Sequence, residues 1–198
     1  AAAALFGYRF NHRSKTELEL DIAGTTHMYR VAAMLAYDQA RKMMSVLVQE
    51  VETNEWFLLA KGADSKMSSL LDTRERWTKQ AQRVVAGSSE HTYTWAEDGL
   101  RTLAFAWRPL SAQYAEDWLS RFDAANASVE QRGLKGKGEA NDIDMLMAEL
   151  ETDLIMQGAT GIEDRLQDDV GETIAVLVEA GIKVWMLTGD KQETAINI

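Results

Sequence analysis

The chain has 198 residues, of which 21 are basic and 31 acidic, so its net charge is −10. Because binding to a phosphate backbone needs clustered Lys and Arg, this balance argues against a nucleic-acid partner. The sequence contains no cysteine, which excludes a disulfide framework and a thiolate metal site. No apolar run approaches the roughly 18 residues of a membrane span. The length suffices for one or two domains with a sizeable core.

Two β-hairpins are predicted in the first third of the chain. Residues 16–22 and 26–31 alternate polar and apolar side chains around a short turn that contains Gly24. The apolar runs 44–48 and 56–59 flank a polar segment and predict the second hairpin.

The middle of the chain mixes predicted helices, strands and loops. Residues 65–71 are expected to form a short helix with Ser65 as its N-cap, and residues 72–82 are expected to be irregular. A later helix is expected to begin after Pro109, with Ser111 as its N-cap. The remaining predictions are a helix over 90–98 that Gly99 ends, a strand over 100–107, a charged Gly-rich loop over 132–140 and a helix over 143–150.

The last part of the chain predicts a strand, a helix and a strand over residues 154–187. The helix over 168–180 begins with acidic residues and is followed by Gly181, and this order is typical of a parallel βαβ crossover. The fold class is therefore predicted to be α+β. A mostly antiparallel sheet flanked by helices is followed by a partial α/β, Rossmann-like segment.

The apolar run 182–187 leads directly into Thr188, Gly189 and Asp190, and a helix-like pattern follows. In α/β sheets, phosphate chemistry is usually held where such residues stand at the carboxyl end of a strand. The pattern continues to the last residue and the chain does not begin with Met, so we expect a piece of a longer protein.

Five motifs, in this order, resemble the P-type ATPases and in particular their phospholipid-flippase branch. They are YDQARKMMSV at 37–46, KGAD at 61–64, GLRTL at 99–103, the run from GAT to EDRLQ at 158–167, and LTGDK at 187–191. The resemblance implies a nucleotide-binding domain over residues 1–162. It also implies a hinge at Glu163 and Asp164, followed over 163–198 by the first part of a haloacid-dehalogenase-type phosphorylation domain.

The resemblance implies ATP contacts for five residues of the first domain. Tyr37 takes the position that stacks on adenine, and Asp38 the adjacent polar position, where the family usually has an uncharged side chain. Lys61 is expected deep in the adenosine pocket, and Arg101 and Thr102 near the phosphates. Each residue alone also has a simpler interpretation: a half-buried aromatic at 37, a solvated turn lysine at 61 and an ordinary strand arginine at 101.

In the second domain, Thr188, Gly189 and Asp190 are expected beside the γ-phosphate. The family's phosphorylated aspartate lies in an Asp-Lys-Thr-Gly-Thr motif that does not occur in this sequence. No catalytic residue and no metal ligand is therefore assigned to the chain, although the family uses Mg²⁺ with ATP.

The implied function is that of the ATP-binding, cytoplasmic-facing part of an integral membrane protein. Such a protein moves phospholipid between leaflets through an aspartyl-phosphate, and an accessory subunit is compatible with it. Three alternatives remain: the same domain of a cation pump, a stand-alone nucleotide-binding module without catalysis, and an interaction domain that uses its acidic surface. The sequence DRLQ at 164–167 disfavours the cation pump, which usually has Asp-Pro-Pro-Arg there.

Overall fold

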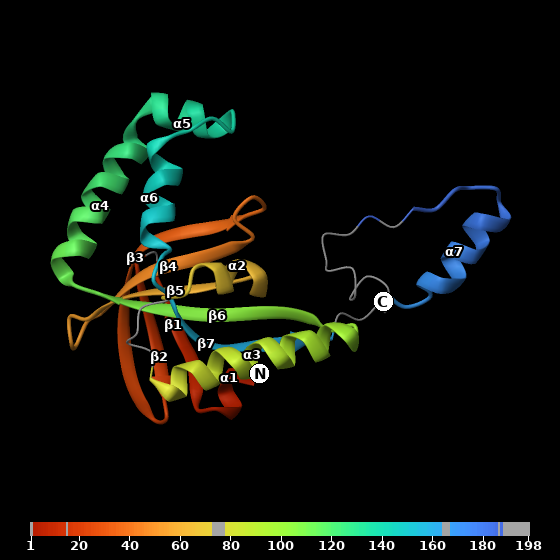
Figure 1. Ribbon diagram of the computed structural model, residues 1–198, viewed down its shortest axis with the longest axis horizontal. Helices are drawn as coiled ribbons and strands as arrows, with labels where there is room; N and C mark the ends of the chain where they lie inside the picture. Colours follow the sequence, from red (N-terminus) through yellow and green to blue (C-terminus); the bar gives the residue numbers. More distant parts are fainter. Residues whose placement is uncertain (1, 15, 73–77, 164–166, 186, 188–198) are drawn as a thin grey trace.

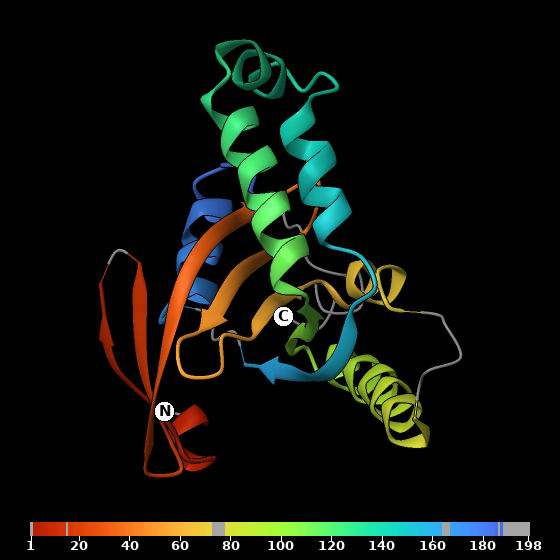
Figure 2. The same cartoon turned by 90° about the vertical axis from the view of Figure 1, so that its left-hand side faces the viewer.

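The computed structural model describes residues 2–14, 16–72, 78–163, 167–185 and 187. Within these ranges, seven strands form one antiparallel sheet whose spatial order follows the sequence (Figures 1 and 2). The strands are β1 (Tyr8–Arg13), β2 (Glu17–Ile22), β3 (Thr25–Asp38), β4 (Met43–Glu50), β5 (Trp56–Gly62), β6 (Arg101–Leu110) and β7 (Ile155–Ile162). The helices are α1 (Ala2–Leu5), α2 (Asp64–Ser69), α3 (Lys79–Glu97), α4 (Ala112–Ala127), α5 (Val129–Gly136), α6 (Asp142–Leu150) and α7 (Val170–Glu179).

Both predicted hairpins are confirmed. β2 pairs with β3 around Ala23 and Gly24, which have φ values of 53° and 89°. β4 pairs with β5 from Met43 opposite Gly62 to Gln49 opposite Trp56. β3 is longer than its predicted core because its first half pairs with β2 and its second half with β4.

Helices cover one face of the sheet. Along β5, Trp56, Leu58 and Ala60 are buried and alternate with more exposed residues, as expected for a strand with one face on the core. The core cluster joins this face to Met67 of α2, to Trp118 of α4 and to the apolar side of α6. The Trp118 indole donates a hydrogen bond of 2.9 Å to the carbonyl oxygen of Leu146, so its polar atom is satisfied within the core. Among the described residues, the helices that pack on the core lie on this face; we call the opposite face, on which Leu59 of β5 is 44% exposed, the open face.

Two predicted helices differ from the structure at their beginnings. α2 begins at Asp64 with Ala63 as its N-cap, so the prediction that Ser65 caps it is wrong. α3 begins at Lys79, well before the predicted residue 90, because the Thr78 hydroxyl accepts a hydrogen bond from the amide of Ala81. The prediction of irregular structure as far as residue 82 is therefore wrong for α3; residues 73–77 lie outside the described residues. Gly99, with φ of 76°, ends α3 as predicted.

The predicted loop over 132–140 is largely wrong. α5 occupies Val129–Gly136, with the Ser128 hydroxyl accepting from the amide of Gln131. Its acidic Glu130 lies in the first turn and its basic Lys135 in the last, as the helix dipole favours. The Ser128 cap and the favourably placed charges at the two ends of α5 offset the low helix propensity of its glycines. The cap at Ser111 and the helix over 143–150 are confirmed.

The predicted parallel βαβ crossover is also wrong. β7 pairs antiparallel with β6, from Arg101 opposite Ile162 to Trp107 opposite Ile155. The predicted helix is present as α7, but residues 182–185 and 187 are not in a strand. α7 stands apart from the sheet (Figure 1), and most of its side chains are exposed.

Candidate nucleotide site

The residues predicted to contact a nucleotide in the first domain lie at one end of the sheet. In an antiparallel sheet, the ends of odd strands and the beginnings of even strands meet at the same edge. Tyr37 and Asp38 end β3, Lys61 is the next-to-last residue of β5, and Arg101 begins β6. The fold thus collects motifs that are widely separated in the sequence.

Strand register places the central residues of this end in a row. Met44 of β4 is opposite Lys61 of β5, and Lys61 is opposite Phe105 of β6. On the other side of Met44, the pairing moves from Leu35–Ser45 to Asp38–Met43, so Ala36 and Tyr37 both stand opposite Met44 in a bulge. Tyr37 and Lys61 are therefore two strands apart, about 10 Å by usual strand spacing.

An apolar hollow of about 140 Å³ lies on the open face beside Lys61. Met44, Val46, Leu59 and Phe105 contribute to its lining. Lys61 is exposed, so the hollow combines an apolar floor with an ammonium group. This combination suits a flat aromatic ligand that carries negative charge.

The turn after β3 is built by Asp38. Its Oδ1 accepts a hydrogen bond of 2.7 Å from the amide of Ala40, a local bond typical of turn-forming aspartates. Tyr37 is 58% exposed and its hydroxyl donates to Oε1 of Gln39 at 3.0 Å. Both residues also line a hollow of about 250 Å³ against α4 and α6, which is distinct from the hollow at Lys61.

Arg101 and Thr102 lie on opposite faces of β6. Because side chains alternate along a strand, Arg101 is on the same open face as Phe105, and Thr102 is on the helix-covered face with the buried Ala104. Arg101 stands four residues from Phe105, about 13 Å along the strand. Tyr37, Lys61 and Arg101 thus share one end of the sheet, but the hollow at Lys61 is lined by neither Tyr37 nor Arg101, and Thr102 is on the other face of β6.

Gly62 has a structural reason to be glycine. A Cβ at this position would lie 2.6 Å from the Cβ of Met43 and 2.8 Å from the carbonyl oxygen of Lys42. The glycine following Lys61 therefore lets the end of β5 lie against the turn that leads into β4. It fixes the distance between the strand that carries Lys61 and the turn that carries Asp38.

The remaining predicted residues are mostly outside the described part of the chain. Thr188, Gly189, Asp190 and the hinge residue Asp164 lie outside it, whereas Glu163 is exposed and directly follows β7. Among the described residues, no group of three or more His, Asp or Glu is placed to hold a metal ion. Within the same ranges, no helix has both the length and the apolar character that a bilayer span requires.

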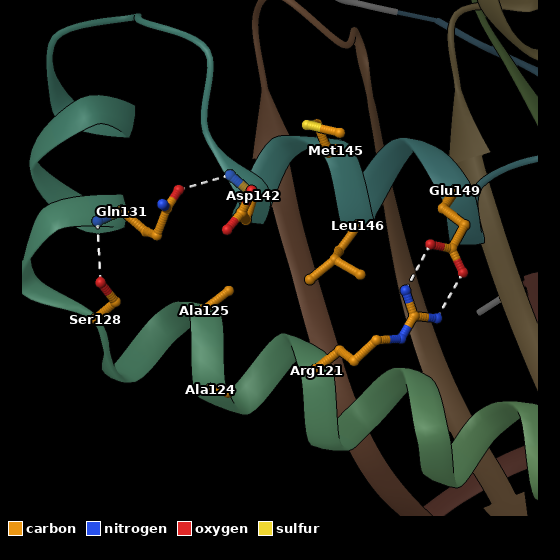
Figure 3. A pocket seen from close by; sticks show the side chains of 9 residues that line it. All are labelled: Arg121, Ala124, Ala125, Ser128, Gln131, Asp142, Met145, Leu146 and Glu149. Atoms are coloured by element: carbon orange, nitrogen blue, oxygen red, sulfur yellow. Dashed lines mark hydrogen bonds and ion pairs between the residues drawn. The ribbon is translucent and has the colours of Figure 1, made fainter.

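A larger hollow, of about 730 Å³, lies between α4, α5 and α6 (Figure 3). Ala124 and Ala125 of α4 and Leu146 of α6 make its floor apolar. The two alanine side chains are small, which leaves room for the hollow. At its rim Arg121 makes two hydrogen bonds to Glu149, of 2.8 and 2.7 Å, which lower the pKa of that carboxyl group. The charge of this guanidinium is balanced by the Glu149 carboxylate.

A family model described as P-type ATPase, cytoplasmic domain N, matches residues 6–169. The chain belongs to this family. The N domain is also similar to proteins named for lipid transport. It is 39% identical over 197 residues to the probable phospholipid-transporting ATPase IM of Homo sapiens, covering 100% of the chain and 15% of the relative.

Two further relatives come from yeast and a plant. The N domain is 38% identical over 203 residues to phospholipid-transporting ATPase DNF2 of Saccharomyces cerevisiae, covering 100% of the chain and 12% of the relative. It is 39% identical over 203 residues to phospholipid-transporting ATPase 10 of Arabidopsis thaliana, covering 100% of the chain and 16% of the relative. The chain thus spans less than a fifth of the length of these relatives.

Sequence reasoning did not single out several residues that lie at or near the candidate site. Met44, Leu59 and Phe105 line the hollow at Lys61, and strand alternation is the signal that relates them to it. Glu151 was missed as well. It is buried and contacts Arg41 of the β3–β4 turn, a pairing across 110 residues for which the sequence has no local pattern.

Proposed function

We propose that this N domain binds ATP on the open face of its sheet, at the end that carries Tyr37, Lys61 and Arg101. The observation that supports the proposal best is the row in which Met44, Lys61 and Phe105 stand side by side across three strands next to an apolar hollow. The hollow suits the nucleotide base. Lys61 and Arg101 supply positive charge for the phosphates at this end of a protein whose net charge is −10.

We further propose that the parent protein is a P-type ATPase that moves phospholipid. The names of the three relatives support this substrate class, and each of them aligns with the whole chain. In such a protein ATP supplies the phosphoryl group, with Mg²⁺ offsetting its charge. The residues described here bind and orient the nucleotide. Lipid selection belongs to parts of the parent protein other than this domain.

Calorimetric titration with ATP tests the site. We expect Lys61→Ala and Arg101→Ala each to weaken binding by about 1.5–3 kcal/mol, the range for hydrogen bonds to charged groups. Lys79→Ala removes an exposed lysine at the first residue of α3, the opposite end of that helix from Arg101, and serves as the control. We also expect no Mg²⁺-dependent phosphate release from the chain, because it lacks the Asp-Lys-Thr-Gly-Thr motif. Equal affinities for all four proteins would show that the site is misplaced.

A further inference from the structure

A buried carboxylate connects the turn after β3 to the far end of α6. Glu151, the residue that ends α6, is 3% exposed. Its Oε1 accepts a hydrogen bond of 2.6 Å from the hydroxyl of Ser45 and one of 2.5 Å from Nη1 of Arg41. Ser45 is itself 2% exposed and lies on β4. Three segments of the chain therefore meet at one oxygen atom.

The Arg41 guanidinium also binds the backbone just before Tyr37. Its Nη2 donates to the carbonyl oxygen of Ala36 at 2.5 Å, while Nη1 binds Glu151. Nε of Arg41 is buried and has no hydrogen-bond partner among the described residues. The guanidinium thus closes the segment from Ala36 to Arg41 into a loop and fastens that loop to α6.

This loop contains the β-bulge that directs Tyr37. Ala36 and Tyr37 together oppose Met44, so strand pairing alone does not decide which of them turns toward the open face. The bond from Arg41 fixes the Ala36 carbonyl group and with it the peptide that leads into Tyr37. A buried ion pair is a costly way to gain stability, since apolar side chains of similar volume stabilise at least as well. In this protein, the ion pair between Arg41 and Glu151 instead fixes the conformation of the backbone at Ala36.

We propose that Arg41 and Glu151 are positioning residues that hold the bulge so that the Tyr37 ring faces the nucleotide base. The proposal rests on the proposed ATP site and extends it, because it places a determinant of nucleotide affinity at the end of α6, 110 residues from the turn. Ser45 supports the same carboxylate from β4, next to Met44 in the hollow at Lys61.

The test is Glu151→Gln, compared with Glu149→Gln as the matched control. Glu149 is on the same helix and also pairs with an arginine, but it does not touch the turn. The first readout is amide exchange at Ala40 and Lys42, whose N–H groups donate to Asp38 Oδ1 and to the Asp38 carbonyl. We expect faster exchange at both amides in Glu151→Gln and no change in Glu149→Gln.

The second readout is ATP affinity measured by calorimetry. We expect Glu151→Gln to weaken binding about tenfold, within the usual range for coupled sites. We also expect Tyr37→Ala to have less effect in the Glu151→Gln background than in the wild type, because the ring is then already misplaced. Additive effects of the two substitutions on affinity would overturn the positioning role.

A double variant separates positioning from stability. Replacing both partners, Arg41→Leu with Glu151→Leu, leaves no unpaired buried charge, so we expect it to unfold at a denaturant concentration close to that of the wild type. We still expect fast exchange at Ala40 and weak ATP binding. If the double variant binds ATP like the wild type, the pair has only a structural role. If the wild type fails to bind ATP, the proposed function fails, while the exchange readout still decides whether Glu151 fixes the turn.

Discussion

At the scale of single residues, two side chains of the candidate site each make a local hydrogen bond in addition to the predicted nucleotide contact. Asp38 stands where a nucleotide contact is predicted, yet its carboxylate builds the turn by accepting from Ala40. The family usually has an uncharged residue at this position, and the local hydrogen bond explains how a carboxylate fits there. Tyr37 likewise binds Gln39 through its hydroxyl while more than half of its surface remains exposed.

The contribution of Tyr37 is tested by two substitutions. Tyr37→Ala removes the aromatic face, and we expect it to weaken ATP binding by about 1–3 kcal/mol, the usual value of one base–aromatic stack. Tyr37→Phe keeps the face and loses only the bond to Gln39, so its affinity should match that of the wild type. The ATP affinities of both variants are measured by calorimetry. If Tyr37→Phe loses as much affinity as Tyr37→Ala, the effect belongs to the hydroxyl group and not to the aromatic face.

Glu50 predicts a pH dependence of stability. Hydrogen bonds from Thr53 at 2.7 Å and from His27 at 3.0 Å hold the pKa of its carboxyl group below the ordinary value. Because the folded pKa is the lower one, the ionised group stabilises the fold fully above the unfolded pKa of about 4.3. That contribution is lost as the pH falls through the folded pKa.

The measurement is the free energy of unfolding in urea between about pH 3 and 7. We expect Glu50→Gln to reduce the loss of stability on acidification, relative to the wild type. The exposed neighbour Glu52, changed to Gln, is the control and should leave the slope unchanged. Parallel curves for all three proteins would contradict a stabilising role of the Glu50 carboxylate.

At the scale of secondary-structure elements, the end of the sheet is held by close backbone packing. The amide of Ala63 donates to the carbonyl oxygen of Lys42 at 3.0 Å, and Gly62 lies against Met43. These contacts align the carboxyl end of β5 with the beginning of β4. They hold the row at Lys61 against the turn that leads into β4.

Gly62→Ala is therefore expected to destabilise the N domain. The added methyl group would meet the Lys42 carbonyl oxygen and the Met43 Cβ well inside van der Waals contact. Overpacking of this kind typically costs about 1–3 kcal/mol, and urea unfolding would measure it. Gly133→Ala is a useful control, because a Cβ there meets nothing within 4 Å. An unchanged midpoint for Gly62→Ala would mean that β5 can move away from the turn.

The elements that the sequence predicted well are those with strong local signals. The β2–β3 hairpin has period-two alternation on both sides of a Gly-containing turn, and α4 has a capping serine. The first half of α3 was missed because it is polar and contains Gly87; its packing through Val84 and Val85 favours the helix. The run 182–187 is apolar like a buried strand, but periodicity cannot supply the pairing partner that a strand requires.

For the candidate site, the motifs named residues that the fold places at one end of the sheet, and their role stays a prediction. Strand alternation explains why Arg101 and Thr102 face opposite ways. The bulge at Ala36 and Tyr37 and the contact from Arg41 to Glu151 were not predictable. The bulge interrupts the pairing of two neighbouring strands without a signal in the alternation pattern, and the Arg41–Glu151 contact joins segments that are 110 residues apart.

At the scale of the whole molecule, the sheet and its helices share one core, whereas α7 takes little part in it. Ile174, Val176 and Val178 are exposed, as are Val184 and Trp185 after the helix. An isolated helix of this length buries too little apolar surface to offset the entropy of ordering it. The proposed boundary between residues 162 and 163 remains a prediction.

Amide exchange tests this boundary. We expect the amides of α7 and of Val184 to exchange much faster than those of β4, whose residues lie in the middle of the sheet. The β7 amides that donate to β6 should resemble those of β4; β7 is the edge strand of the sheet, so its other amides are left out of the comparison. Protection of Val184 equal to that of Leu47 would show that the segment after residue 163 is an integral part of the N domain.

The sequential order of the seven strands has a consequence for synthesis on the ribosome. From β1 to β5, each new strand emerges directly after the strand with which it pairs, so little loop-closure entropy opposes pairing as the chain grows. β6 and β7 are the exceptions, because α2 and α3 separate β6 from β5, and α4, α5 and α6 separate β7 from β6. Until each of these segments has been translated, one edge of β5 and then one edge of β6 keeps its N–H and C=O groups without their final partner, which leaves these edges open to chaperones and to aggregation.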